Sequence, residues 1–183
     1  GHAGFLGLER IRELTEDQGL TFDEAVEAAR AGTVFTTHTP VPAGHDAFPF
    51  SQVEKHLAGS WGDIGPHRER FLALGQHDNG TGSQFNMTAL AMRTAAHING
   101  VSALHGEVTR AMWTPLWPDT PADQVPIRSI TNGVHLPTWM AASLFDLLNR
   151  HLGAGWLDRS DDPALWERLL DIPDEELWAL RQK

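Results

Sequence analysis

Two short β-branched segments, each ending in a polar turn, restrict the fold of this chain more than any other feature of its sequence. Residues 33–37 read TVFTT and lead directly into His38, and residues 126–130 read PIRSI and lead into the turn TNG at 131–133. Runs of this kind are typical of buried strands, and helical patterns flank both of them. The alternation predicts an α/β layer structure, in which ligands gather at the carboxyl ends of strands. This rule directs attention to His38 and Asn132.

Helical patterns account for most of the remaining chain. Thr21 and Glu24 are spaced as a capping box at the start of one helix. Apolar residues between 86 and 112 keep a helical period on both sides of the Asn-Gly pair at 99–100, which predicts two buried helices joined by a tight turn. The polar segment QHDNGTGSQ at 76–84 is expected to be a loop. Further helices are expected near residues 5–14, 51–61, 66–75 and 137–148 and within residues 160–181.

Composition limits the class of protein. The 183 residues include 14 Lys and Arg against 24 Asp and Glu, a formal net charge of −10, which argues against a nucleic-acid partner. No apolar run approaches the roughly 20 residues of a membrane helix, so no membrane partner is expected. The absence of cysteine fits a reducing, cytoplasmic compartment. The chain starts without Met and enters an amphipathic pattern at once, so we expect a segment of a longer protein.

Several chemical motifs are absent. The sequence has no HExxH pattern, and His38 and His45 have only Asp46 as a nearby carboxylate in ligand register, so no metal site is predicted. No glycine-rich phosphate-binding fingerprint follows a strand. His45 is interpreted as a loop histidine that is hydrogen-bonded to backbone.

The residues alone leave two interpretations of His38 with equal weight. As a neutral imidazole at a strand end, it would offer one donor and one acceptor to a polar ligand such as a sugar hydroxyl. As a buried histidine, it would tie the proline-rich loop to the strand. Asn132 is more often only a turn residue, although its amide would suit a sugar hydroxyl. Trp139 is interpreted as a core residue, and His97 and His105 as structural histidines on helices.

Four stretches together resemble one protein family, in the order that the family has them. They are GHAGFLGLERIREL at 1–14, TVFTTHTPVPAGHDAFP at 33–49, FNMTALAMRTAAHINGVSALHGEVTR at 85–110 and ITNGVHLPTW at 130–139. They resemble the α-glucan phosphorylases, which include glycogen, starch and maltodextrin phosphorylases, and most closely the shorter bacterial form. The likeness extends over essentially the whole chain. The THTPVPAGHD loop is distinctive, whereas NGV after a strand is shared with many glycosyltransferases.

The resemblance implies a fold and a reaction. The family has a GT-B glycosyltransferase fold, with the active site between two Rossmann-like domains. Residues 1–133 are expected to form the last part of the first domain and residues 134–183 the start of the second. The family uses inorganic phosphate to cleave the terminal α-1,4-linked glucose of a glucan, which gives glucose 1-phosphate. Family members are commonly homodimers, so a homodimer is the expected assembly.

The resemblance also assigns substrate contacts to single residues. His38 matches a histidine that contacts the transferred glucose near its primary hydroxyl, and Thr39 follows it as in the family. Asn132 matches an asparagine that bonds another hydroxyl of the same sugar, and Val101 a valine packed against that subsite. His2 matches a histidine that lines the pocket beside the sugar.

The family's cofactor is pyridoxal phosphate, which is bound to a lysine. The resemblance places only one residue that contacts this cofactor within the chain. Trp139 matches a tryptophan that packs near the cofactor, whereas Lys55 and Lys183 do not lie in the family's cofactor motif. No group of the chemical step is identified, so the chain alone is expected to be inactive. Two alternatives stay open: another GT-B enzyme, such as a nucleotide-sugar glucan synthase, and a non-catalytic glucan-binding subunit.

Overall fold

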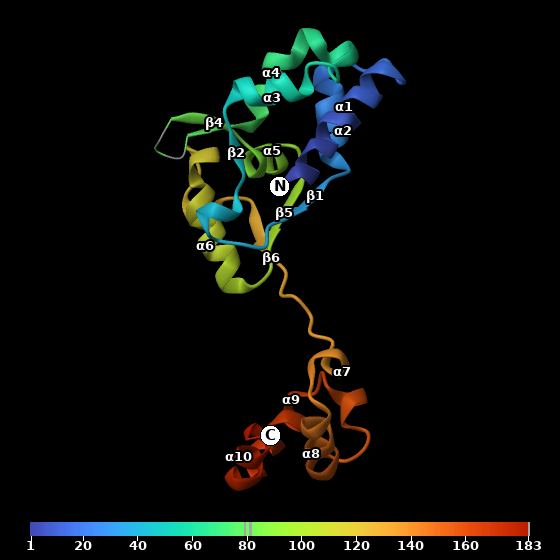
Figure 1. The fold of residues 1–183 in the computed structure, drawn as a ribbon, viewed down its shortest axis with the longest axis vertical. Coiled ribbons are helices and arrows are strands. Elements are labelled where there is room, and N and C mark those ends of the chain that lie inside the picture. Colours follow the sequence, from blue (N-terminus) through green and yellow to red (C-terminus); the bar gives the residue numbers. More distant parts are fainter. Residues whose placement is uncertain (79, 81, 183) are drawn as a thin grey trace. The chain divides into compact units, whose positions relative to one another are not determined.

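Helices and short strands alternate along the chain in the computed structural model, which describes residues 1–78, 80 and 82–182 (Figure 1). The chain divides into two compact units, Gly1–Asn132 and Gly133–Lys183. The helices of the first unit are α1 (Leu6–Glu16), α2 (Phe22–Ala31), α3 (Phe50–Leu57), α4 (Arg68–Gly75), α5 (Met87–Arg93) and α6 (Ala103–Trp113). Its strands are β1 (Val34–Thr36), β2 (Ala47–Phe48), β3 (Gln76–Asp78), β4 (Ser83–Asn86), β5 (His97–Gly100) and β6 (Ile127–Ser129). The second unit contains α7 (Leu136–Trp139), α8 (Ala142–Leu152), α9 (Pro163–Glu167) and α10 (Asp174–Arg181).

A parallel sheet with the strand order β1-β5-β6 lies at the centre of the first unit (Figure 1). Both strands that the sequence predicts are present, and the mixed α/β class with a parallel sheet is confirmed. The central strand, β5, was predicted as part of a helix, and this prediction was wrong. The strand HING has only four residues and one large apolar side chain, Ile98, so it is too short for hydrophobic periodicity to distinguish it from part of a helix. Asn99 and Gly100 are therefore strand residues rather than a turn.

A second sheet is antiparallel, with the order β2-β4-β3. The polar segment 76–84 was expected to be a loop, but β3 and the first half of β4 lie within it, and residues 79 and 81 of that segment lie outside the described residues. The register pairs Phe48 with Phe85 and His77 with Gln84. Strand pairing therefore takes precedence here over local polarity, because Phe85 anchors β4 in the core.

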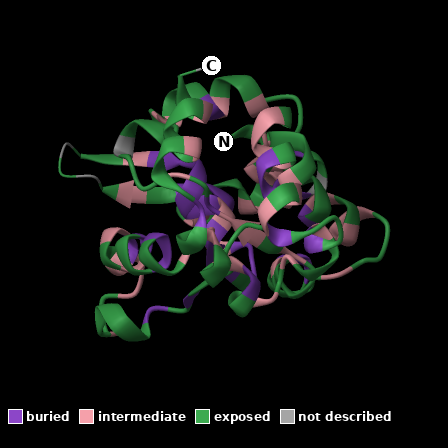
Figure 2. Ribbon diagram, turned by 90° about the horizontal axis from the view of Figure 1, so that it is seen from below, coloured by how far each residue is buried: buried purple, intermediate pink, exposed green. Residues whose placement is uncertain are grey.

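Two clusters of buried apolar residues hold the first unit together, and buried and exposed positions alternate along its helices (Figure 2). One cluster joins α1–α5 with β4 and has Phe85 at its centre, with a fully buried ring 6.0 Å from that of Phe5. The other joins α5, α6 and the parallel sheet through Met92, Ile98 and Trp113. The second cluster fixes the helices that flank the carboxyl ends of β5 and β6.

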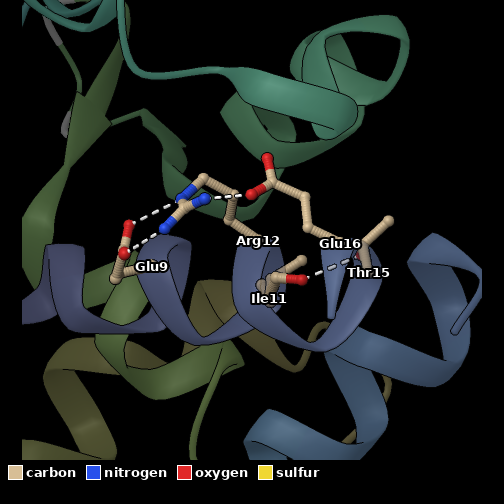
Figure 3. A network of polar contacts seen from close by, with 5 residues as sticks. All are labelled: Glu9, Ile11, Arg12, Thr15 and Glu16. Atoms are coloured by element: carbon tan, nitrogen blue, oxygen red, sulfur yellow. Dashed lines mark hydrogen bonds and ion pairs between the residues drawn. The ribbon is translucent and has the colours of Figure 1, made fainter. Parts of the chain in front are cut away.

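One face of α1 is polar. Arg12 forms ion pairs with Glu9 and Glu16, and the Thr15 hydroxyl donates to the Ile11 carbonyl (Figure 3). Ion pairs at partly exposed positions contribute little to stability, so the apolar face of α1 decides its position. Within the described residues, no helix is both long and apolar enough to cross a membrane.

The second unit has an apolar core of its own. Buried residues from α8, α9, the segment between them and the segment after α9 form it: Leu147, Leu148, Leu152, Trp156, Leu165 and Ile172. The Trp156 indole donates to the Asn149 side chain at 3.1 Å, which satisfies a polar group that would otherwise be buried without a partner.

We expect Asn86→Ala to lower the free energy of unfolding by about 2 kcal/mol. The buried Asn86 side chain is the N-cap of α5, and its carbonyl oxygen accepts from the backbone N–H groups of Thr88 (2.9 Å) and Ala89 (3.0 Å). Removal of the cap leaves both donors buried without a partner. Thr21→Ala at the exposed cap of α2 is the matched control and should cost about 1 kcal/mol, because water replaces the lost acceptor. Urea denaturation followed by circular dichroism checks both values, and equal losses would contradict the argument.

Candidate functional site

The carboxyl ends of β1, β5 and β6 form one continuous edge of the parallel sheet. Hydrogen bonds extend past the strands themselves: the Thr37 N–H donates to the Asn99 carbonyl at 3.0 Å, and the Ile130 N–H donates to the Gly100 carbonyl at 2.9 Å. The Asn132 N–H donates to the Val101 carbonyl at 3.1 Å. The segments that leave the three strands therefore remain side by side and place their next residues at one site.

Close contact between β5 and α6 shapes this edge. A Cβ atom on Gly100 would lie 3.1 Å from the Gly106 backbone nitrogen, and one on Gly106 would lie 3.0 Å from the Ser129 Cβ. The two glycines thus let α6 begin directly behind the strand ends. The Ser102 hydroxyl caps α6 by accepting from the His105 N–H at 3.1 Å, and His105 Nδ1 accepts from the Val101 N–H at the same distance. Val101 is therefore fixed through both of its backbone polar groups.

His38 lies at this edge, two residues beyond the end of β1. Its side chain is exposed, and within the described part of the chain it has no hydrogen-bonding partner, so the interpretation of His38 as a buried structural histidine is wrong. Thr39 follows it with a half-buried side chain whose hydroxyl accepts from the Val41 N–H at 3.2 Å. The structure leaves both nitrogens of the His38 imidazole available for a ligand.

Val101 and Asn132 lie beside each other on the neighbouring strand ends. Val101 is half-buried and presents an apolar surface, whereas the Asn132 amide is exposed. The turn interpretation of Asn132 concerns its backbone, which is paired with Val101, and leaves the side chain free for a ligand. Three consecutive strands of the sheet thus supply an imidazole, an apolar side chain and an amide to the same edge.

The remaining predicted contacts lie elsewhere on the chain. His2 is exposed, with its ring 6.3 Å from that of Phe48, and it lines a cavity of about 330 Å³ that includes His56 and Leu57 of α3. Trp139 belongs to the second unit, and its side chain is 79% exposed, so its interpretation as a core residue is wrong. An exposed indole suits a contact with a planar partner.

The other histidines correct the sequence-based expectations. His97 is an exposed residue at the start of β5 rather than a helical residue. His45 was expected to bond to backbone, and the Thr39 backbone acts on its ring as a hydrogen-bonding partner. Its Nδ1 also shares a hydrogen bond of 2.8 Å with the Thr88 hydroxyl. Thr88 is 43 residues away along the chain, so no local pattern could have indicated this contact.

Neither a metal site nor a covalent cofactor site is formed by the described residues. No group of three or more His, Cys, Asp or Glu side chains is arranged among them to hold a metal ion. Lys55 is an exposed residue of α3, and Lys183 lies outside the described residues.

Polar side chains beyond the carboxyl ends of parallel strands are the arrangement in which open α/β sheets generally bind ligands. Residues 1–176 match the profile of the family described as Carbohydrate phosphorylase, and the chain belongs to this family. It is 45% identical over 183 residues to the maltodextrin phosphorylase of Thermococcus litoralis, covering 100% of this chain and 21% of that protein. It is 46% identical over 189 residues to the glycogen phosphorylase of Mycobacterium tuberculosis, with 100% and 21% covered. The glycogen phosphorylase of Aquifex aeolicus is 36% identical over 177 residues, with 97% and 25% covered. The chain thus spans about a fifth to a quarter of the length of these relatives.

Proposed function

We propose that this chain is the glucosyl-contacting segment of an α-glucan phosphorylase. The parent protein would transfer the terminal α-1,4-linked glucose of a glucan to inorganic phosphate, which gives glucose 1-phosphate and a glucan one unit shorter. The observation that supports this role is the convergence of His38, Val101 and Asn132 on the carboxyl edge of the parallel sheet. Relatives named maltodextrin phosphorylase and glycogen phosphorylase add the substrate class.

The chemistry of the edge suits an uncharged sugar. The His38 imidazole and the Asn132 amide each offer a donor and an acceptor, which is the pairing that sugar hydroxyls need. Val101 supplies an apolar contact for the ring face. Groups fixed on three adjacent strands hold the reacting sugar in one orientation, and orientation accounts for a large part of the barrier reduction in group transfer. His2 and Thr39 are further proposed members of the pocket.

The cofactor proposed for the parent is pyridoxal phosphate, which supplies a phosphate group beside the substrate phosphate. The described residues do not fit its covalent attachment, because the one lysine among them, Lys55, is a solvent-exposed residue of α3. Trp139 is the residue proposed to contact the cofactor, through its exposed indole.

The larger architecture is proposed on the same basis. Residues 1–133 would form the end of the first domain of a GT-B fold, and residues 134–183 the start of the second. We also propose a homodimer and a cytoplasmic location for the parent.

The test is an assay of the full-length parent with maltoheptaose and inorganic phosphate. We expect glucose 1-phosphate to appear in step with the shortened glucan. Consumption of a nucleotide sugar without any phosphate dependence would instead identify a glucan synthase. Binding of maltoheptaose with no product under either condition would identify a non-catalytic subunit.

We expect the 183-residue chain alone to release no glucose 1-phosphate from maltoheptaose, because it lacks a lysine placed for the cofactor. The purified chain is incubated with pyridoxal phosphate, phosphate and glucan, and the product is followed with phosphoglucomutase coupling. The full-length parent at the same concentration is the positive control. Any product that scales with the concentration of the short chain contradicts this expectation.

A further inference from the structure

We propose that His45 is the positioning residue that fixes the loop carrying His38 and Thr39 in place at the edge of the sheet. This loop, residues 37–46, leaves the parallel sheet after β1 and enters the antiparallel sheet at β2. The position of the loop follows from contacts within this chain. The effect of His45 on a sugar ligand rests on the proposed function.

His45 joins the loop to two helices. Its Nδ1 shares a hydrogen bond of 2.8 Å with the hydroxyl of Thr88, a buried residue of α5. Its ring meets the ring of Trp113, the last residue of α6, at 5.2 Å between centroids and an interplanar angle of 83°, which is the edge-to-face geometry that aromatic pairs prefer. Of the two imidazoles in the loop, His45 is therefore tied to the core while His38 is free.

The loop turns back on itself so that His45 secures the segment next to His38. The Gly44 N–H donates to the Val41 carbonyl at 3.0 Å, which closes a turn. A Cβ atom on Gly44 would lie 2.3 Å from Cγ2 of Thr39, so the end of the loop packs directly on the residue after His38. On the other side of His45, the Asp46 carbonyl accepts from the Met87 N–H at 2.9 Å. Any shift of His45 would therefore move Thr39 and the residue before it.

The neutral form of His45 is the form that fits. Burial lowers the pKa of His45 below its ordinary value of about 6.5, and the Gly1 ammonium and His105 act in the same direction. The Thr39 backbone and the Asp46 carboxylate oppose this shift without cancelling it. The ring's Nε2 is buried. A second proton on this ring would place a charge at a partly desolvated position, which burial penalises.

The sign of the pH dependence follows from this depressed pKa. Above about pH 6.5, the imidazole is neutral whether the loop is closed or open, so the closed form has its full stability. As the pH falls from there toward the lowered pKa of the closed form, the open loop binds a proton that the closed loop does not. Each unit of difference between the two pKa values raises the open population about tenfold.

His77 provides a matched control. Its ring lies 5.0 Å from that of Trp113, and burial lowers its pKa as well, with Arg93 adding to the effect and Asp78 opposing it. His77 belongs to β3, however, and not to the loop. Replacement of His77 removes a similar imidazole next to the same indole and leaves the Thr88 contact intact.

The experiment measures amide hydrogen exchange of Thr39, Val41 and Gly44 by NMR in the chain, corrected for intrinsic rates, between about pH 5 and 8. In the wild type we expect protection to fall as the pH is lowered below about 6.5. In His45→Asn, whose side-chain amide is polar but does not titrate in this range, we expect low protection at every pH. His77→Asn should keep the wild-type profile.

Thr88→Val covers the case in which His45→Asn does not fold, because it deletes the same hydrogen bond from the other partner with little change in volume. It should lower protection at neutral pH and leave His45 able to titrate. A wild-type profile in His45→Asn would overturn the proposal, and so would loss of the pH dependence in His77→Asn.

A second measurement separates this proposal from the proposed function. Addition of D-glucose at millimolar concentration to the wild type should shift the His38 ring signal, and the affinity should fall about tenfold in His45→Asn. If glucose produces no shift in the wild type, the proposed function fails. The exchange measurement then still decides whether His45 positions the loop.

Discussion

Replacement of His38 by alanine in the full-length parent should lower kcat/KM for glucan phosphorolysis by about 10²-fold or more, the loss typical of one oriented hydrogen-bonding group at a reacting centre. His38 is exposed at the carboxyl end of β1 and has no partner among the described residues, so the alanine variant leaves no unpaired group behind. Its fold should therefore be intact. The loss should appear in kcat more than in KM, because the bond to the sugar strengthens as charge develops at the anomeric carbon.

His97→Ala is the control for this prediction. His97 is an exposed histidine of the same sheet, but it begins β5 and so lies at the amino end of that strand, opposite the proposed site. Its replacement should leave kcat/KM unchanged. Steady-state kinetics with maltoheptaose and phosphate measure both variants. Equal rates for the wild type and His38→Ala would show that His38 does not contact the reacting sugar.

The part of the fold that was predictable from the sequence is the part with strong local signals. The strands at 34–36 and 127–129 follow from β-branched residues, and the capping box at Thr21 marks the start of α2 correctly. The central strand was missed because its four residues are too few to show a strand period. The antiparallel hairpin was missed because β3 consists of the polar residues QHD, which pair with β4 through backbone bonds that composition does not reveal.

The candidate site likewise has a part that was predictable from the sequence and a part that was not. The rule that ligands gather at the carboxyl ends of parallel strands identified His38 and Asn132, and the structure brings them to one edge with Val101. The anchoring of the loop was not predictable, because His45 contacts Thr88 and Trp113, which are distant from it along the chain. Tertiary contacts of this kind are decided by packing and not by local sequence.

Replacement of Phe85 by alanine should produce the largest loss of stability, about 4 kcal/mol in the free energy of unfolding, since large-to-small changes of buried Phe cost about 3–5 kcal/mol. The Phe85 ring is fully buried and contacts three others, those of Phe5 (6.0 Å), Phe71 (6.1 Å) and Phe50 (6.3 Å). A Cβ atom on Gly75 would lie 2.4 Å from this ring, so α4 packs against it without a gap. The truncated side chain therefore leaves a cavity that backbone and aromatic rings line and cannot readily fill.

The magnitude matters because small domains have only about 5–15 kcal/mol of net stability, so Phe85→Ala should bring the first unit close to unfolding at ambient temperature. Leu104→Ala, at a position that is 69% exposed, is the control and should change stability by less than about 0.5 kcal/mol. Urea denaturation followed by near-ultraviolet circular dichroism distinguishes the two outcomes. Phe85→Leu should recover most of the loss, because it restores most of the buried volume. A loss below about 1 kcal/mol for Phe85→Ala would mean that Phe85 does not anchor β4 in this core. The core would then not hold β4 in place, and β4 is the strand that pairs with β2 at the end of the His38 loop.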